Sequence, residues 1–182
     1  MIHALIIGPR GAGKSTLIRR VIQELHCPVF GFETKREPEM ADEILGNPIY
    51  IHKIGEPRHY AEDNLMGYCK NRRFNTLAGA FDSYAPKLMQ SVPDGGVICF
   101  DELGFMETQE ARFCQAVLSK LDGNIPIIAA VKDKDFPFLN EVRAHPNCRC
   151  FYLTEENRDE LFLAVLRFVQ ASFAMNKHQE RS

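Results

Sequence analysis

The sequence predicts a three-layer α/β protein with a mostly parallel sheet, and two observations support this. Apolar runs typical of strands alternate along the chain with segments whose apolar residues recur at helical spacing. The strand runs are apolar almost throughout, as expected where helices cover both faces of a sheet. No repeat or change of composition divides the 182 residues, so we expect a single domain over 1–182 with a frayed polar tail at 176–182.

The first strand and the first helix flank a glycine-rich loop. Residues 1–7 are apolar except His3 and predict a buried strand, and helical spacing of apolar residues predicts a helix over 14–25. The loop between them matches GxxxxGK[ST] at every fixed position. Its glycines permit positive φ and bring backbone N–H groups close to an anion. It therefore predicts a phosphate-binding P-loop formed by Gly8, Pro9, Arg10, Gly11, Ala12, Gly13, Lys14, Ser15 and Thr16.

Two side chains of this loop have expected roles in binding a nucleoside triphosphate. Lys14 is placed to reach the β- and γ-phosphate oxygens and to act in catalysis, and the Ser15 hydroxyl to ligate Mg²⁺. Arg10, inside the loop, faces either solvent or the nucleotide. The partner that the loop predicts is thus a triphosphate such as ATP or GTP, with Mg²⁺ as cofactor.

The next segment predicts a β-hairpin at the margin of the sheet. Residues 29–34 are rich in aromatic and β-branched side chains, 35–38 resemble a turn or exposed crossing, and 49–54 alternate as a second strand. The segment 56–75 has no clear periodicity and carries several arginines. Two interpretations stay open there: an arginine that approaches the triphosphate, or a solvated loop.

A second functional element follows a helix expected over 77–90. The apolar run 97–100 leads directly into Asp101 and Glu102, and open α/β sheets bind ligands at this carboxyl edge. Asp101 is therefore expected to hold Mg²⁺ opposite Ser15. Glu102 is the candidate general base, or the residue that orients the attacking water.

The remaining elements continue the alternation of helices and strands. They are a helix that begins at Thr108, a strand over 125–131, a short helix over 138–144, a strand over 148–153, and a last helix with Thr154 as N-cap. Lys132 and Lys134 follow the strand over 125–131. They either touch phosphate or form an ordinary solvated charge run.

Composition limits the partners and the location of the chain. With 22 basic and 24 acidic residues the net charge is -2, so we expect no general attraction to nucleic acid or membranes, and the sequence indicates no partner protein. No apolar segment approaches the length of a membrane span, the apolar N-terminal run lacks a basic leader, and the cysteines show no zinc spacing. We expect a cytoplasmic protein whose six cysteines are reduced thiols.

Four blocks of sequence resemble the small P-loop nucleoside-triphosphatases of the cancer-related type. They are GPRGAGKSTL at 8–17, GFETKRE at 31–37, DELGFME at 101–107 and LTEENRDEL at 153–161. The resemblance implies a RecA-like sheet of the additional-strand, catalytic-glutamate division, and Mg²⁺-dependent hydrolysis of nucleoside triphosphates with little base preference. It assigns phosphate binding to the residues 13–16, the metal to Asp101 and the base to Glu102.

The same resemblance suggests that Asn157 and Arg158 lie near the nucleotide, although both residues could simply support the start of the last helix. Two departures from the family's usual sequence concern substrate choice. They are Ala130-Val131-Lys132 in place of a Thr-Val-His type strand end, and Gly46-Asn47-Pro48-Ile49 in the hairpin.

Three functions are compatible with these residues. The leading one is hydrolysis to a nucleoside diphosphate and phosphate. A nucleotide or small-metabolite kinase uses the same loop, but no arginine-rich lid is evident over 132–147, which holds only Arg143. A nucleotide-dependent binding module with slow hydrolysis is the third, with 56–75 as the segment that changes order.

Overall fold

The computed structural model describes residues 1–179, with side chains as far as Phe173. The last helix runs to Gln179, so 176–179 of the expected polar tail are helical. Residues 180–182 lie outside the described part of the chain.

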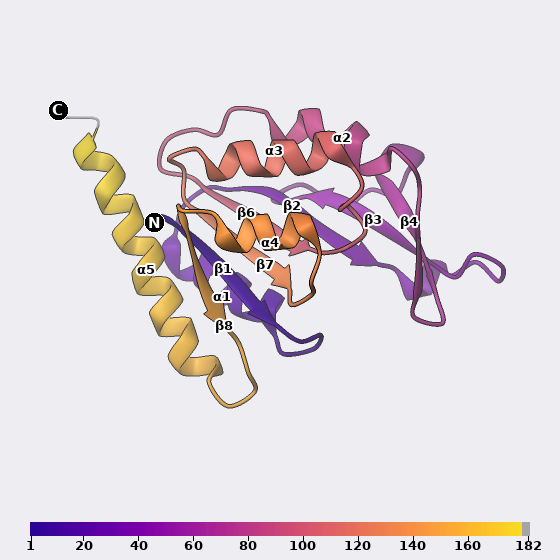
Figure 1. Cartoon of the computed structure of the whole chain (residues 1–182), viewed down its shortest axis with the longest axis horizontal. Coiled ribbons are helices and arrows are strands. Elements are labelled where there is room, and N and C mark those ends of the chain that lie inside the picture. The colour runs from indigo at the N-terminus through magenta and orange to yellow at the C-terminus, as the bar shows by residue number, and fades with distance from the viewer. Residues whose placement is uncertain (180–182) are drawn as a thin grey trace.

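An eight-stranded sheet forms the middle layer, in the order β5-β4-β3-β2-β6-β7-β1-β8 (Figure 1). Five neighbouring strands are parallel, and β7 lies between β1 and β6. This is the RecA-like order with one additional strand, so the predicted fold class is confirmed. The parallel strands are β2 (Val29–Arg36), β6 (Val97–Leu103), β7 (Ile127–Lys132), β1 (His3–Gly8) and β8 (Cys148–Tyr152).

Helices cover both faces of the sheet (Figure 1). On one face α1 (Lys14–Leu25) and α5 (Arg158–Gln179) pack over a core that includes Ile6, Leu17 and Val165. On the other face a larger core includes Phe81 and Phe113. The helices over that core are α2 (Ala80–Leu88), α3 (Ala111–Leu121) and α4 (Pro137–Ala144).

The margin of the sheet is larger than the predicted hairpin. β3 (Asn47–Lys53) pairs antiparallel with β2, as expected, but β4 (Leu65–Lys70) and β5 (Arg73–Thr76) add two more antiparallel strands. The interpretation of 56–75 as a solvated loop was therefore wrong for 65–70 and 73–75, which are strand, whereas 57–61 have no regular structure. The turn between β4 and β5 holds Asn71 and Arg72 at φ of 50° and 64°. Two-residue hairpin turns of this kind usually carry glycine at the second position. This chain has Arg72 there, so its sequence lacks the usual sign of a hairpin.

Several boundaries differ from the predictions. β2 continues to Arg36 because its last residues pair with β3, so 35–36 are not a turn. α2 and α3 begin three residues later than expected, at Ala80 and Ala111. α5 begins at Arg158, and its first backbone hydrogen bond ends on Asn157 rather than on Thr154, which is not the N-cap.

Two shorter elements complete the margin: 3₁₀ turns at Pro38–Met40 and Glu62–Asn64. None of the helices described is both long and apolar enough to cross a membrane. All six cysteines are free thiols.

Candidate active site

The P-loop joins the end of β1 to the start of α1. Gly11 and Gly13 have φ of 84° and 101°, values that side chains other than glycine rarely adopt. These turns bring the loop backbone round to the N-terminus of α1, where the first N–H groups have no partner within the helix. The positive end of the helix dipole points to the same place, so the loop is suited to bind phosphate.

Lys14 is buried and folds back over the loop. Its Nζ donates hydrogen bonds to the carbonyl oxygens of Gly8 at 2.8 Å and Pro9 at 3.1 Å, and lies 3.0 Å from Oε1 of Glu102. The ammonium group thus connects the loop to the acid at the end of β6. This contact joins two residues that the sequence assigned to catalysis.

Ser15 and Asp101 also meet, as expected. The Ser15 hydroxyl donates a 2.8 Å hydrogen bond to Oδ1 of Asp101, which is buried. Carboxylate and hydroxyl oxygens are hard ligands of the kind that Mg²⁺ prefers, and Mg²⁺ at such sites is held by few protein groups together with phosphate and water. The donor set therefore fits Mg²⁺.

A chain of charges lies beside Asp101. Lys35 on β2 is 3.3 Å from Oδ2 of Asp101 and 3.4 Å from Oε2 of Glu33. Arg58 donates two hydrogen bonds, of 2.9 and 2.6 Å, to Oε1 of Glu33. Burial opposes the charge of Glu33, but Lys35 and Arg58 outweigh it and lower the pKa of this carboxyl. Arg58 is therefore engaged with Glu33, and an approach of an arginine of 56–75 to the phosphates stays a prediction.

Lys35 was not among the predicted site residues, because the sequence predicts a turn or exposed crossing at 35–38. A signal was available in the alternation of side chains along a strand, which puts residues 33 and 35 on one face and 34 and 36 on the other. In the structure Glu33 and Lys35 lie on the side of Asp101. Thr34 and Arg36 line a cavity on the other side.

Glu102 has a second cation beside it. Its Oε2 is 3.7 Å from Nζ of Lys132, the last residue of the strand β7. The Lys132 ammonium also lies 4.6 Å from the ring centre of Phe105 and 5.4 Å from that of Phe74. Lys132 is thus not part of a merely solvated charge run, and Glu102 stands between two lysines.

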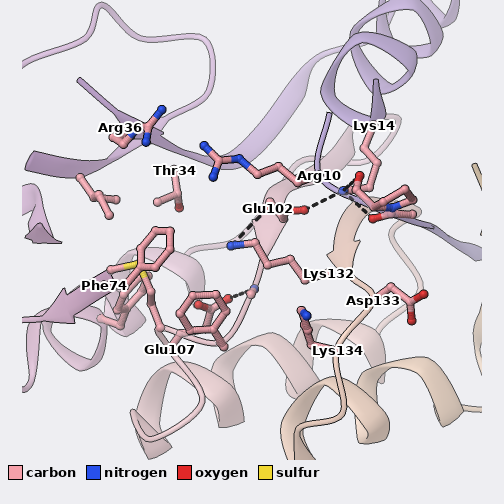
Figure 2. A pocket seen from close by; sticks show the side chains of 17 residues that line it. Arg10, Lys14, Thr34, Arg36, Phe74, Glu102, Glu107, Lys132, Asp133 and Lys134 are labelled. Atoms are coloured by element: carbon pink, nitrogen blue, oxygen red, sulfur yellow. Dashed lines mark hydrogen bonds and ion pairs between the residues drawn. The ribbon is translucent and has the colours of Figure 1, made fainter. Parts of the chain in front are cut away.

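Glu102 and Lys132 open into a cavity of about 480 Å³ (Figure 2). Its walls come from the P-loop, β2, β3, β5, α2 and the loops that follow β6 and β7. Figure 2 shows the Arg10 side chain reaching across this space toward Thr34. Arg10, whose position the sequence left open, therefore forms part of the wall of this cavity.

Glu107 closes the cavity at its base. Its side chain is buried and accepts a hydrogen bond from the backbone N–H of Gly104. Burial raises the pKa of this carboxyl to about 7, although the hydrogen bond from Gly104 acts in the opposite direction. The helix start expected at Thr108 does not form. Residues 104–110 instead fold as a turn that holds this acid inward.

Arg158 and Asn157 form hydrogen bonds with different parts of the chain. Nε of Arg158 donates a 2.9 Å hydrogen bond to the carbonyl oxygen of Ala12 in the P-loop. The Asn157 side chain accepts from the backbone N–H of Thr154 and donates to the carbonyl oxygen of Tyr152. Asn157 therefore supports the start of α5, while Arg158 touches the loop itself. A direct role of either residue in nucleotide binding stays a prediction.

These features define a class of proteins. A P-loop whose lysine and serine face two acids at the end of a parallel strand, with one strand inserted between, is the arrangement of P-loop nucleoside-triphosphatases of the additional-strand division. The family model described as NTPase matches residues 3–166, which is most of the chain. The chain belongs to this NTPase family.

Individual relatives can be aligned with this chain over nearly their whole length. A protein of Bos taurus named cancer-related nucleoside-triphosphatase homolog is 26% identical, over 93% of this chain and 97% of its own. A nucleoside-triphosphatase THEP1 of Natranaerobius thermophilus is 29% identical, over 87% and 91%. The crystal structure of THEP1 from Aquifex aeolicus has a TM-score of 0.65 at 22% identity, over 92% of this chain and 98% of that one, which shows a shared fold.

The family match decides between the functions that the sequence left open. It supports nucleoside-triphosphate hydrolysis, and it gives no support to the kinase or the binding module. The resemblance that the four sequence blocks suggested is confirmed.

Proposed function

We propose that the chain hydrolyses nucleoside triphosphates, such as ATP and GTP, to the diphosphate and inorganic phosphate with Mg²⁺ as cofactor. The observation that carries this proposal is the pair of contacts at the P-loop, Lys14 with Glu102 and Ser15 with Asp101. These contacts support the proposal because they bring together the lysine, the serine and the two acids to which it assigns the phosphates, the metal and the water. A cytoplasmic location is part of the proposal, and six free thiols support it.

Binding begins with an exchange of partners at Lys14. Its Nζ now satisfies the carbonyl oxygens of Gly8 and Pro9 and the carboxylate of Glu102. In the complex the same ammonium group turns to phosphate oxygens, which releases Glu102 for its own role. Ser15 and Asp101 would hold Mg²⁺, which when bound neutralises charge on the phosphates.

Glu102 then acts on the attacking water. Its carboxylate accepts a proton as the water oxygen bonds to the terminal phosphorus, and the bond from that phosphorus to the bridging oxygen breaks. The electron pair leaves with the diphosphate. Lys14, once released from Glu102, supplies positive charge beside the phosphoryl group. Lys132, whose Nζ lies 3.7 Å from Oε2 of Glu102, adds a second positive charge there.

The first prediction concerns Glu102→Gln. The amide keeps the size of the side chain but cannot accept the proton, so we expect phosphate release to fall by about 100-fold or more. Binding of a fluorescent triphosphate analogue should change little. Glu24→Gln, on the exposed side of α1, is the matched control and should release phosphate at the rate of the unaltered protein. Equal rates in Glu102→Gln and Glu24→Gln would rule out the base role.

A further inference from the structure

The cavity beside Glu102 is larger than hydrolysis requires. A water molecule and the terminal phosphate would occupy a small part of about 480 Å³, and a cavity of this volume is in the range of small-molecule sites. If the triphosphate binds as proposed, its terminal phosphate points toward Glu102. The remaining space then lies beyond that phosphate, away from Arg158 and the start of α5.

One wall of the cavity suits an aromatic ring. Phe74 on β5 and Phe105 after β6 meet edge to face, with ring centres 5.0 Å apart and planes at 85°. The lining continues with the apolar side chains Ile49, Phe81 and Met106. Aromatic side chains stack favourably on planar ligands, and a site that handled only water and phosphate would gain nothing from them.

The other walls carry uncompensated positive charge. Three cationic side chains line the cavity without a side-chain hydrogen bond or ion pair to any described residue: Arg10, Arg36 and Lys134. Each is exposed, but they come from the P-loop, β2 and the loop after β7 and line the same cavity. Convergent cations around a cavity attract an anion.

Two polar groups of the lining add to this picture. The hydroxyl of Thr34 is buried without a hydrogen-bond partner in the described part of the chain, which is uncommon for a polar atom. Glu107 at the base loses its charge near neutral pH because burial raises its pKa to about 7. The cavity therefore opposes an anion less than its three lining acids, Glu102, Glu107 and Asp133, would if all were charged.

We propose that this cavity binds a second ligand beside the triphosphate, a small organic anion that carries an aromatic ring and reaches at most the size of a mononucleotide. The ring packs on Phe74 and Phe105, and the anionic group faces Lys134. The inference rests on the proposed function, because that function places the terminal phosphate at the mouth of the cavity.

The test uses phenyl phosphate as the probe, with the P-loop saturated by Mg²⁺ and a non-hydrolysable triphosphate analogue. Calorimetry should detect binding of phenyl phosphate to this complex. Benzyl alcohol and inorganic phosphate, which each lack one feature, should bind at least about fivefold more weakly. Displacement of the analogue by phenyl phosphate would mean that the probe occupies the P-loop, and it would overturn the proposal.

Two variants locate the probe. Phe74→Leu keeps apolar volume but removes the ring, and Lys134→Gln removes a cation, so each should weaken phenyl phosphate about fivefold or more. Lys87→Gln, on the outer side of α2 next to Asp63, is the matched control and should bind as the unaltered protein does. Equal affinity in all three variants would also overturn the proposal.

The design separates the two hypotheses. Binding of the analogue, measured in the same preparations, reports on the triphosphate site and on correct folding of the variants. Absence of phenyl phosphate binding in a complex that holds the analogue rejects the second site alone. Failure of the analogue to bind rejects the proposed function, and the dependence of phenyl phosphate binding on Phe74 and Lys134 then still decides the cavity.

Discussion

Two buried titratable side chains change the stability of the fold with pH in opposite directions. His3 on β1 is fully buried, with Nε2 2.9 Å from the carbonyl oxygen of Leu121 and Nδ1 3.2 Å from the backbone nitrogen of Ile127. These partners define a neutral ring that donates from Nε2 and accepts at Nδ1. Burial lowers the pKa of His3 to about 4, and burial raises that of Glu107 to about 7.

The sign of each effect follows from proton counts. Between pH 4 and 6.5 the unfolded chain binds more protons than the folded one at His3, so its contribution to stability is lost as the pH falls. Between pH 4.5 and 7 the folded chain binds more at Glu107, so that contribution is lost as the pH rises. From pH 4.5 to 6.5 the two effects oppose each other.

Because the two effects oppose each other in the unaltered protein, we predict that each pH dependence becomes visible when the other residue is replaced. From pH 4.5 to 6.5, Glu107→Gln should show a free energy of unfolding that rises with pH relative to the unaltered protein, and His3→Gln one that falls. Each difference should approach about 1 kcal/mol per pH unit, and urea unfolding at several pH values measures it. Parallel pH curves for both variants and the unaltered protein would contradict the prediction.

At the scale of elements, α2 and α3 stabilise each other through their N-termini. Glu110, the residue before α3, accepts hydrogen bonds from the backbone N–H groups of Gly79 and Asp82 at the start of α2. Asp82 in turn accepts from the N–H of Phe113 in α3. Each carboxylate thus satisfies free N–H groups of the other helix and lies at the positive end of its dipole. This exchange explains why both helices begin later than helical spacing suggests.

We predict that Glu110→Ala lowers the free energy of unfolding by about 1–2 kcal/mol, because it leaves two helix N–H groups without acceptors. Glu24→Ala, an exposed acid on α1, should change it by less than about 0.5 kcal/mol. Since Asp82 belongs to both caps, Asp82→Ala combined with Glu110→Ala should cost less than the sum of the two single changes. A fully additive double variant would show that the caps act independently.

At the scale of the whole molecule, the elements that could be predicted are those that depend on the pattern of residues close together in the sequence. The P-loop, the buried strands and α1 depend on residues that are neighbours in sequence, and the acids Asp101 and Glu102 follow directly from a strand end. The β4–β5 strands depend on pairing between segments, and their turn lacks the glycine that marks such hairpins.

The site was predictable only in part for the same reason. The contacts of Ser15 with Asp101 and Lys14 with Glu102 follow once two parallel strand ends share one edge of the sheet. Lys35 and Arg10 acquire their positions from the register of β2 and from the walls of a cavity, which segments distant in sequence build together. Alternation along a strand indicates that Glu33 and Lys35 share a face, but it does not indicate which distant residues they meet.

The last prediction concerns the stability of the complete fold. A ligand that binds only the folded chain stabilises it by about 2.7 kcal/mol at 100 times its dissociation constant. For a chain of 182 residues this corresponds to a rise of roughly 5–10 °C in Tm. We expect that rise with Mg²⁺ and a non-hydrolysable triphosphate analogue, measured by calorimetry.

Two variants separate binding from chemistry in this measurement. Lys14→Ala removes the cation that turns from Gly8 and Pro9 to the phosphates, so most of the rise in Tm should disappear. Glu102→Gln should keep the rise while phosphate release fails, because its carboxylate is needed for the water and not for the phosphates. An equal rise in Lys14→Ala would place the triphosphate outside the P-loop, and the hydrolytic roles of both acids would then lose their basis.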